Sequence, residues 1–275
     1  MNKYEYAQEV CKHINAKGYQ TEIKNDYRNN GSYVAITVRP QGAKKVAPVF
    51  TIGDEAEDPV IFAQKILEFI PAQIDTDAVE EVMFNKEEVL SRTYYILVNT
   101  KLNESRTSLV RRPINETLEL QYKIDISDIV DGGRISLEHK HIETIGITDN
   151  ELYIRAYANT MEKYPYCLQS MGDILPIGIL DEVPKMYVLT NNQKVNGAGA
   201  ILYKGIKEVL ENTVGEETIL IPSSVHEWIV IPANLGEKRT ITTMIRDVNS
   251  SVLSPEDVLS DRPYELIADG VLFEV

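Results

Sequence analysis

The segment with the densest set of reactive side chains is IPSSVHEW, residues 221–228, which carries Ser223, Ser224, His226 and Glu227. A serine hydrolase needs a hydroxyl nucleophile, a histidine that removes its proton and a third group that orients the histidine. Ser224, His226 and Glu227 have the side-chain types for these roles. The segment lacks the G-x-S-x-G elbow and a preceding glycine-rich oxyanion loop. We therefore expect a turn between two strands, with serine hydroxyls bonded to backbone amides, and keep a hydrolase using the Ser–His pair as the alternative.

Candidate metal ligands are few. His139 and His141 form an H-x-H pair, which on a strand would place both imidazoles on one side as half of a metal site. The surrounding pattern predicts a helix over residues 136–145, on which the two rings point apart. Cys11 and Cys167 are too few for a cysteine-built metal site, and we interpret both as buried apolar side chains. The sequence therefore predicts no bound metal and no cofactor.

Two further segments have residues suited to anions. The backbone amides of NGAG, residues 196–199, follow a predicted strand and open a predicted helix. The dinucleotide fingerprint would need glycine at position 202, which is Leu202, so we expect a helix start packed closely on a sheet. The main basic cluster consists of Lys101, Arg106, Arg111 and Arg112. Arginine forks suit carboxylate or phosphate ligands, but the pattern favours a solvated sheet edge protected by charge.

The hydrophobic periodicity predicts an α+β fold with an N-terminal αββα module, residues 1–84, and a larger mixed domain, residues 85–275. The first module is expected to consist of two helices and two strands, at residues 3–17, 33–38, 46–52 and 59–70, with QGAKK as the hairpin loop. Asp58-Pro59 has the sequence of a helix N-terminus, and an acidic helical stretch at 75–91 follows.

The larger domain is expected to begin with strands at residues 93–99, 108–112 and 118–126, followed by two helices, the second of which starts at Thr148. Its centre is a βαβ-like unit at 186–232, in which strands 186–190 and 219–222 are joined by a helix over 198–212. The remaining expected elements are a helix at 237–248, a short helix after Ser254 and final strands within 263–275.

This βαβ-like unit predicts where a ligand would bind. If strands 186–190 and 219–222 are parallel neighbours, their carboxyl ends lie together at one rim of the sheet. We therefore expect a polar ligand-binding site formed by Asn191, Asn192, Ser223 and His226.

The composition narrows the class of protein. The 275 residues carry a formal net charge of -14, which opposes binding to nucleic acid because such binding requires exposed Lys and Arg. The sequence has no apolar run long enough to span a membrane and no signal-peptide pattern at residues 1–15. We expect a cytoplasmic protein that binds neither nucleic acid nor membrane.

The second half resembles an uncharacterised family from Gram-positive, largely gut-dwelling bacteria. The segments that carry the resemblance are ITDNELYIRAYANT, MYVLTNNQKVNGAGAILY, ILIPSSVHEWIVIPA and DVNSSVLSPEDVLSDRPYEL. More remotely, the order of elements from Tyr94 onward is similar to that of the YtpQ-like family. The resemblance implies a domain of unknown function and transfers no catalytic role to Ser224 or His226.

The sequence has no complete catalytic, cofactor or metal motif. We therefore predict a non-enzymatic binding or protein-interaction protein, whose partner could be another protein. The alternatives are the Ser–His hydrolase and an accessory protein of a mobile element or phage that acts on host machinery.

Overall fold

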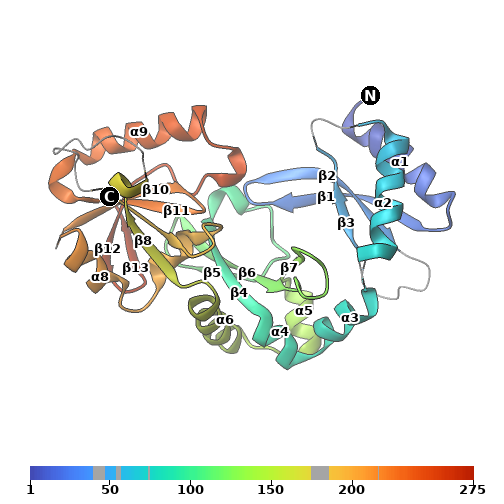
Figure 1. The fold of residues 1–275 in the computed structure, drawn as a ribbon, viewed down its shortest axis with the longest axis horizontal. Helices are drawn as coiled ribbons and strands as arrows, with labels where there is room; N and C mark the ends of the chain where they lie inside the picture. Colours follow the sequence, from blue (N-terminus) through green and yellow to red (C-terminus); the bar gives the residue numbers. More distant parts are fainter. Residues whose placement is uncertain (40–46, 54–56, 74, 175–185, 216) are drawn as a thin grey trace.

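The protein has an α+β fold, as the sequence predicts, and its described residues form three antiparallel sheets (Figure 1). The computed structural model describes residues 1–39, 47–53, 57–73, 75–174, 186–215 and 217–275. None of the helices in these ranges is long and apolar enough to cross a membrane.

The N-terminal module packs two helices on a three-stranded sheet. Its elements are α1 (Lys3–Asn15), β1 (Gln20–Arg28), β2 (Gly31–Arg39), β3 (Val49–Thr51) and α2 (Pro59–Gln73). The start of α1 is fixed by Asn2, whose side chain accepts from the Glu5 amide. As expected, Asp58 caps α2 by accepting from the Val60 amide at 2.9 Å. Strand β1 was not predicted, because QTEIKNDYR alternates weakly, and the QGAKK loop lies outside the described residues.

A central sheet follows. Helices α3 (Thr76–Phe84) and α4 (Lys86–Arg92) lead into β4 (Thr93–Asn99), a 3-10 turn η1 (Lys101–Asn103), β5 (Arg111–Pro113), β6 (Leu118–Asp125) and β7 (Arg134–Ser136). The strand order is β4-β6-β5, and β7 pairs with β6. Helices α5 (His139–Ile145) and α6 (Asp149–Lys163) come next, and the Thr148 side chain caps α6 as predicted. The expected helix from residue 136 begins later, because residues 134–136 extend the sheet as β7.

The last sheet has six strands. Its strands are β8 (Tyr166–Ser170), β9 (Tyr187–Asn191), β10 (Thr218–Ser224), β11 (Glu227–Pro232), β12 (Tyr264–Ala268) and β13 (Val271–Glu274). The elements between them are α7 (Met171–Ile174), the 3-10 helix η2 (Gly197–Leu202), α8 (Ile206–Thr213), η3 (Ala233–Leu235), α9 (Lys238–Ser251) and η4 (Pro255–Asp257). The order is β13-β12-β10-β11-β9-β8.

Two expectations about this sheet were wrong. Strands β9 and β10 both pair antiparallel with β11, so they run in the same direction but are not neighbours. The short turn after β10 makes a hairpin with β11, which inserts between them. The helix expected over 198–212 is divided into η2 and α8, because Gly205 between them has a left-handed backbone with φ of +84°.

Two large hydrophobic cores hold the molecule together. One fills the N-terminal module, and the other joins the central and six-stranded sheets around Trp228 and Tyr264. Val79, Val82 and Met83 of α3 pack into the second core, although they precede residue 85. The division into domains at residue 84 stays a prediction.

The β1–β2 hairpin extends from the N-terminal module to the remainder of the chain (Figure 1). At its tip, the Asn29 side chain donates to Glu256 O at 2.6 Å, and Asn30 donates to Pro255 O at 2.9 Å and Val258 O at 2.6 Å. Buried Asn103 of the central part bonds to both hairpin asparagines. We call these contacts the hairpin clasp. They position the N-terminal module over the central sheet.

Candidate ligand-binding sites

The rim predicted from the βαβ-like unit exists, although its strand order differs from the prediction. Strands β9 and β10 end on the same side of the sheet because they share a direction. Thr190 Oγ1 donates to His226 O at 2.7 Å, which joins the two strand ends directly. Gly197 lies in the same junction, where an added Cβ would lie 2.6 Å from the His226 carbonyl oxygen. The NGAG segment is therefore a close-packed helix start, as expected.

His226 holds loops together at this rim. Its Nδ1 accepts from the Asn196 amide at 2.9 Å, so the proton of the neutral ring is on Nε2, which lies 3.1 Å from Asp257 Oδ1. Ser224 Oγ accepts from the main-chain amide of His226 at 3.1 Å. Both ring nitrogens therefore have partners other than Ser224. The nucleophile–base hydrogen bond that the hydrolase alternative requires is not formed.

The other predicted rim residues also have structural bonds. Ser223 Oγ donates to Glu227 Oε1 at 3.2 Å. The buried Asn191 side chain donates to Val195 O at 2.9 Å and accepts from the Gln193 amide at 3.0 Å. Asn192 is exposed. The structure brings these residues to one rim, and their role as a ligand site stays a prediction.

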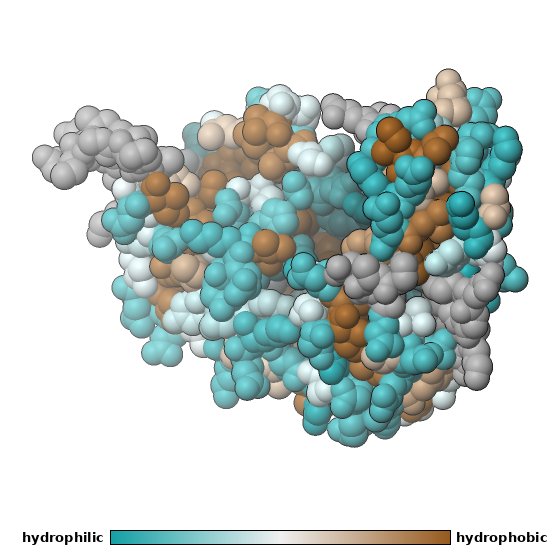
Figure 2. All heavy atoms as spheres, turned by 45° about the vertical axis from the view of Figure 1, so that its right-hand side comes forward, coloured by the Kyte–Doolittle hydropathy of each residue, from teal (hydrophilic) through white to brown (hydrophobic). Residues whose placement is uncertain are grey.

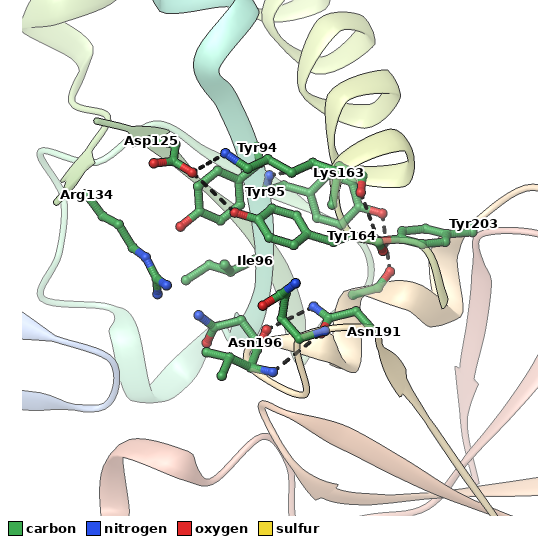
Figure 3. Close-up of a pocket in the computed structure, with 14 residues that line it drawn as sticks. Tyr94, Tyr95, Ile96, Asp125, Arg134, Lys163, Tyr164, Asn191, Asn196 and Tyr203 are labelled. Atoms are coloured by element: carbon green, nitrogen blue, oxygen red, sulfur yellow. Dashed lines mark hydrogen bonds and ion pairs between the residues drawn. The ribbon is translucent and has the colours of Figure 1, made fainter. Parts of the chain in front are cut away.

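The hollow beside Asn191 is a pocket of about 380 Å³ that we call the tyrosine pocket (Figure 3). Four tyrosine rings line this pocket, those of Tyr94, Tyr95, Tyr164 and Tyr203. Asp125 forms an ion pair with Lys163, and its other oxygen accepts from the Ser127 amide at 2.8 Å. Burial alone would raise the pKa of Asp125, but the hydrogen bonds from Lys163 and Ser127 outweigh it and lower this pKa to about 2. The charges of Asp125 and Lys163 thus balance each other.

A larger cleft of about 830 Å³ lies between the N-terminal module and the central sheet. Figure 2 shows a hollow between these two parts of the molecule. We call it the basic cleft, because six basic side chains line it: Lys24, Arg28, Arg106, Lys123, Arg134 and Lys140. Its two acidic side chains are already engaged, since Asp26 pairs with Arg28 at 3.7 Å and Glu138 pairs with Lys140 at 2.6 Å. In the described part of the chain, the other four cations have no ion-pair partner.

Arg106 lies deepest among these cations. Its side chain is only 5% exposed, so the expectation of a solvated edge is wrong at Arg106, whereas Lys101 is exposed and Arg111 and Arg112 are half-buried. Arg106 Nη1 donates to Gln121 Oε1 at 2.9 Å. Its Nε is buried and has no hydrogen-bond partner among the described residues. Burial lowers the pKa of Arg106.

Lys123 on β6 is the second of these cations and is half-buried. Its Nζ donates to Ser136 Oγ at 2.7 Å. Burial, and to a smaller extent the nearby charge of Arg106, lower the pKa of Lys123 to about 8. The sequence analysis did not single out Lys123 or Arg134. The available signal was the polar face of LELQYKIDI, which places Glu119, Gln121, Lys123 and Asp125 opposite the apolar face.

The histidine pair lies on a helix, as predicted. His139 and His141 belong to α5, where His141 Nδ1 accepts from the Glu138 amide at 3.2 Å. Burial lowers the pKa of His141. Within the described ranges, no three His, Cys, Asp or Glu side chains are grouped so that they could hold a metal ion.

No curated protein and no solved structure matches the chain significantly. Similarity to the YtpQ-like family and an origin in gut bacteria stay predictions. Residues 3–266 match the model of a family described as a family of unknown function, DUF5688. This match confirms the resemblance to an uncharacterised family. The chain belongs to that family, DUF5688.

Proposed function

We propose that the protein is a non-enzymatic binding protein whose ligand is a small anion held in the basic cleft. The observation that carries the proposal is the buried guanidinium of Arg106, whose Nε has no partner among the described residues. Proteins rarely leave a buried charged donor unsatisfied, because such a group loses its hydration without compensation. An anionic ligand would supply the missing acceptor.

The charge distribution supports the same conclusion. The chain carries a net charge of -14, yet four cations that have no ion-pair partner among the described residues line one cleft. Like charges at close range oppose each other, and the lowered pKa of Lys123 reflects this together with burial. A bound anion would remove both costs. The volume of about 830 Å³ lies within the usual range for small-molecule sites.

The alternative function, a hydrolase that uses Ser224 and His226, has less support. At the rim, His226 is bonded through both ring nitrogens to Asn196 and Asp257, and Ser224 accepts from an amide. A hydrolase would need the imidazole to face the serine hydroxyl. We therefore favour binding over hydrolysis.

Calorimetric titration with pyrophosphate tests the proposal. We expect the wild-type protein to bind it and the Arg106→Met variant to lose at least about tenfold in affinity, because a charged hydrogen bond disappears. Arg239→Met is the matched control, since Arg239 is exposed on α9 and does not line the cleft. It should bind like wild type.

A second variant keeps the test valid if Arg106→Met does not fold. Lys24 lines the cleft but is exposed, so Lys24→Met should fold normally and lose several-fold in affinity. Circular dichroism checks the fold of each variant. The proposal fails if wild type does not bind pyrophosphate, or if the Arg106 and Lys24 variants bind as tightly as the Arg239 variant.

A further inference from the structure

We propose that the anion bound in the basic cleft is a nucleoside phosphate, with its base against an aromatic wall of the N-terminal module and its phosphate at the cations of the central sheet. This inference rests on the proposed function of the cleft. It adds the ligand's chemical class, which follows from the different chemistry of the two sides of the cleft.

The aromatic wall is the surface formed by Val49, Phe50 and Phe69 on the N-terminal side of the cleft. Phe50 and Phe69 pack edge to face, with ring centroids 6.1 Å apart and planes at 87°. Phe69 is 43% exposed and Val49 is 39% exposed, which is high for such residues on one surface. An edge-to-face pair leaves one ring face open, and a flat base can stack on such a face.

The opposite side of the cleft suits a phosphate. Lys123 and Arg134 lie on the neighbouring strands β6 and β7 of the central sheet, and Arg106 lies in the loop between η1 and β5. Arginine forks bind phosphate oxygens through two parallel hydrogen bonds, and a lysine adds a point charge. A phosphate monoester carries close to two negative charges at neutral pH. A single carboxylate would leave more of the four unpaired cations uncompensated.

The origin of the two surfaces in different parts of the chain also points to a nucleotide. The aromatic wall belongs to β3 and α2, whereas the cations at Arg106 and Lys123 belong to the central part of the chain. A ligand that contacts both needs a spacer between its ring and its phosphate, and the sugar of a nucleotide is such a spacer. The cavity of about 830 Å³ is large enough for a ligand of this size.

Titrations with AMP, inorganic phosphate and adenosine test this inference. We expect AMP to bind at least about tenfold more tightly than either phosphate or adenosine, because only AMP contacts both surfaces. In Phe69→Ala, the affinity for AMP should fall about tenfold while the affinity for inorganic phosphate and pyrophosphate stays the same. The control is Phe273→Ala, which removes an exposed aromatic ring on β13, outside the cleft; Phe273 is 61% exposed and Phe69 is 43% exposed.

The outcomes separate the two proposals. If pyrophosphate binds in the Arg106-dependent way described above but AMP binds no better than phosphate, the nucleotide inference fails and the anion site remains. The inference also fails if Phe69→Ala and Phe273→Ala have the same affinity for AMP. If neither pyrophosphate, phosphate nor AMP binds, the anion-binding function itself is wrong.

Discussion

The tyrosine pocket and the basic cleft lie beside the same strand, β6. They differ in how completely their charged side chains are compensated by hydrogen-bond and ion-pair partners. In the tyrosine pocket, the carboxylate of Asp125 is compensated by Lys163 and by the Ser127 amide. In the basic cleft, Lys123 lies two residues away, and its only hydrogen-bond partner within the described ranges is the hydroxyl of Ser136; Arg106 Nε has no partner there.

This difference distinguishes charged residues that stabilise the fold from charged residues that are available to a ligand. A buried charge with complete partners stabilises the fold and has little capacity left for a ligand. A buried charge without partners destabilises the fold, so its presence indicates a role other than stability. By this criterion, we interpret Asp125 as a structural residue, and Arg106 and Lys123 as residues of the proposed anion site.

The largest effect should come from Gly197, next to the residues Asn196 and Gly199 that line the tyrosine pocket. A Cβ in Gly197→Ala would lie 2.2 Å from Thr190 Oγ1 and 2.6 Å from both Asn191 N and His226 O. Because two of these atoms are backbone, the strand ends themselves must move. We expect a loss of about 3 kcal/mol in the free energy of unfolding, measured by denaturant titration.

Gly172→Ala is the control for this variant. The nearest atom to its new Cβ, Ser170 Oγ, would lie 3.6 Å away, which is ordinary contact. Its stability should stay within about 0.5 kcal/mol of wild type. Equal stability of the two variants would contradict the rigid packing of the rim.

The second largest effect on the free energy of unfolding should come from the ion pair between Asp125 and Lys163. In Asp125→Asn, Lys163 loses its carboxylate partner, so the variant should lose about 2 kcal/mol at neutral pH, the value that follows from a pKa lowered to about 2. Since folding lowers this pKa, the stabilisation is complete above about pH 4 and disappears as the pH falls toward 2. Chemical denaturation across this pH range measures it.

Exposed Asp128 provides the comparison, because its ion pair with Arg92 is at the surface. Asp128→Asn should change the stability by less than about 0.5 kcal/mol. The structural role of Asp125 would be refuted if its variant lost no more than the Asp128 variant.

Strand β6 shows which structural features the sequence pattern predicts and which it does not. The alternation in LELQYKIDI predicted the strand correctly and identified its apolar face. The residues of the opposite face are polar, yet Glu119 is 1% and Gln121 is 0% exposed. Alternation reports local chemistry only. It contains no information about the side chains that pack on this face, where Arg106 Nη1 donates to Gln121 Oε1 and Arg111 pairs with Glu119.

The rim shows the same limit. Local signals gave both strands, the serine turn and the Thr148 cap correctly. The prediction that β9 and β10 are neighbours was wrong, because β11 forms a hairpin with β10 and lies between the two strands. The Asp257 partner of His226 comes from a loop 31 residues away, and nothing in the local sequence pattern indicates this pairing.

The third effect is at this rim. His226→Ala removes the acceptor of the buried loop amide at Asn196 and the partner of Asp257. Because the site is partly exposed and water can replace one bond, we expect a loss of about 1 kcal/mol in the free energy of unfolding. The control is His13→Ala on the surface of α1, which should be neutral. Unchanged stability of the His226 variant would instead favour the ligand-binding role predicted from the sequence.

The smallest change in stability should come from Arg106→Met, although this variant should have the largest effect on binding. The substitution deprives Gln121 Oε1 of a donor, which destabilises the fold, but it also removes a buried charge with an unsatisfied Nε, which stabilises it. Methionine retains most of the apolar stem volume. We expect the two contributions to offset each other within about 0.5 kcal/mol, measured by denaturant titration without added anions against the Arg239→Met control. A loss as large as that of Asp125→Asn would show that Arg106 is as structural as Asp125, and the distinction between the two hollows would no longer hold.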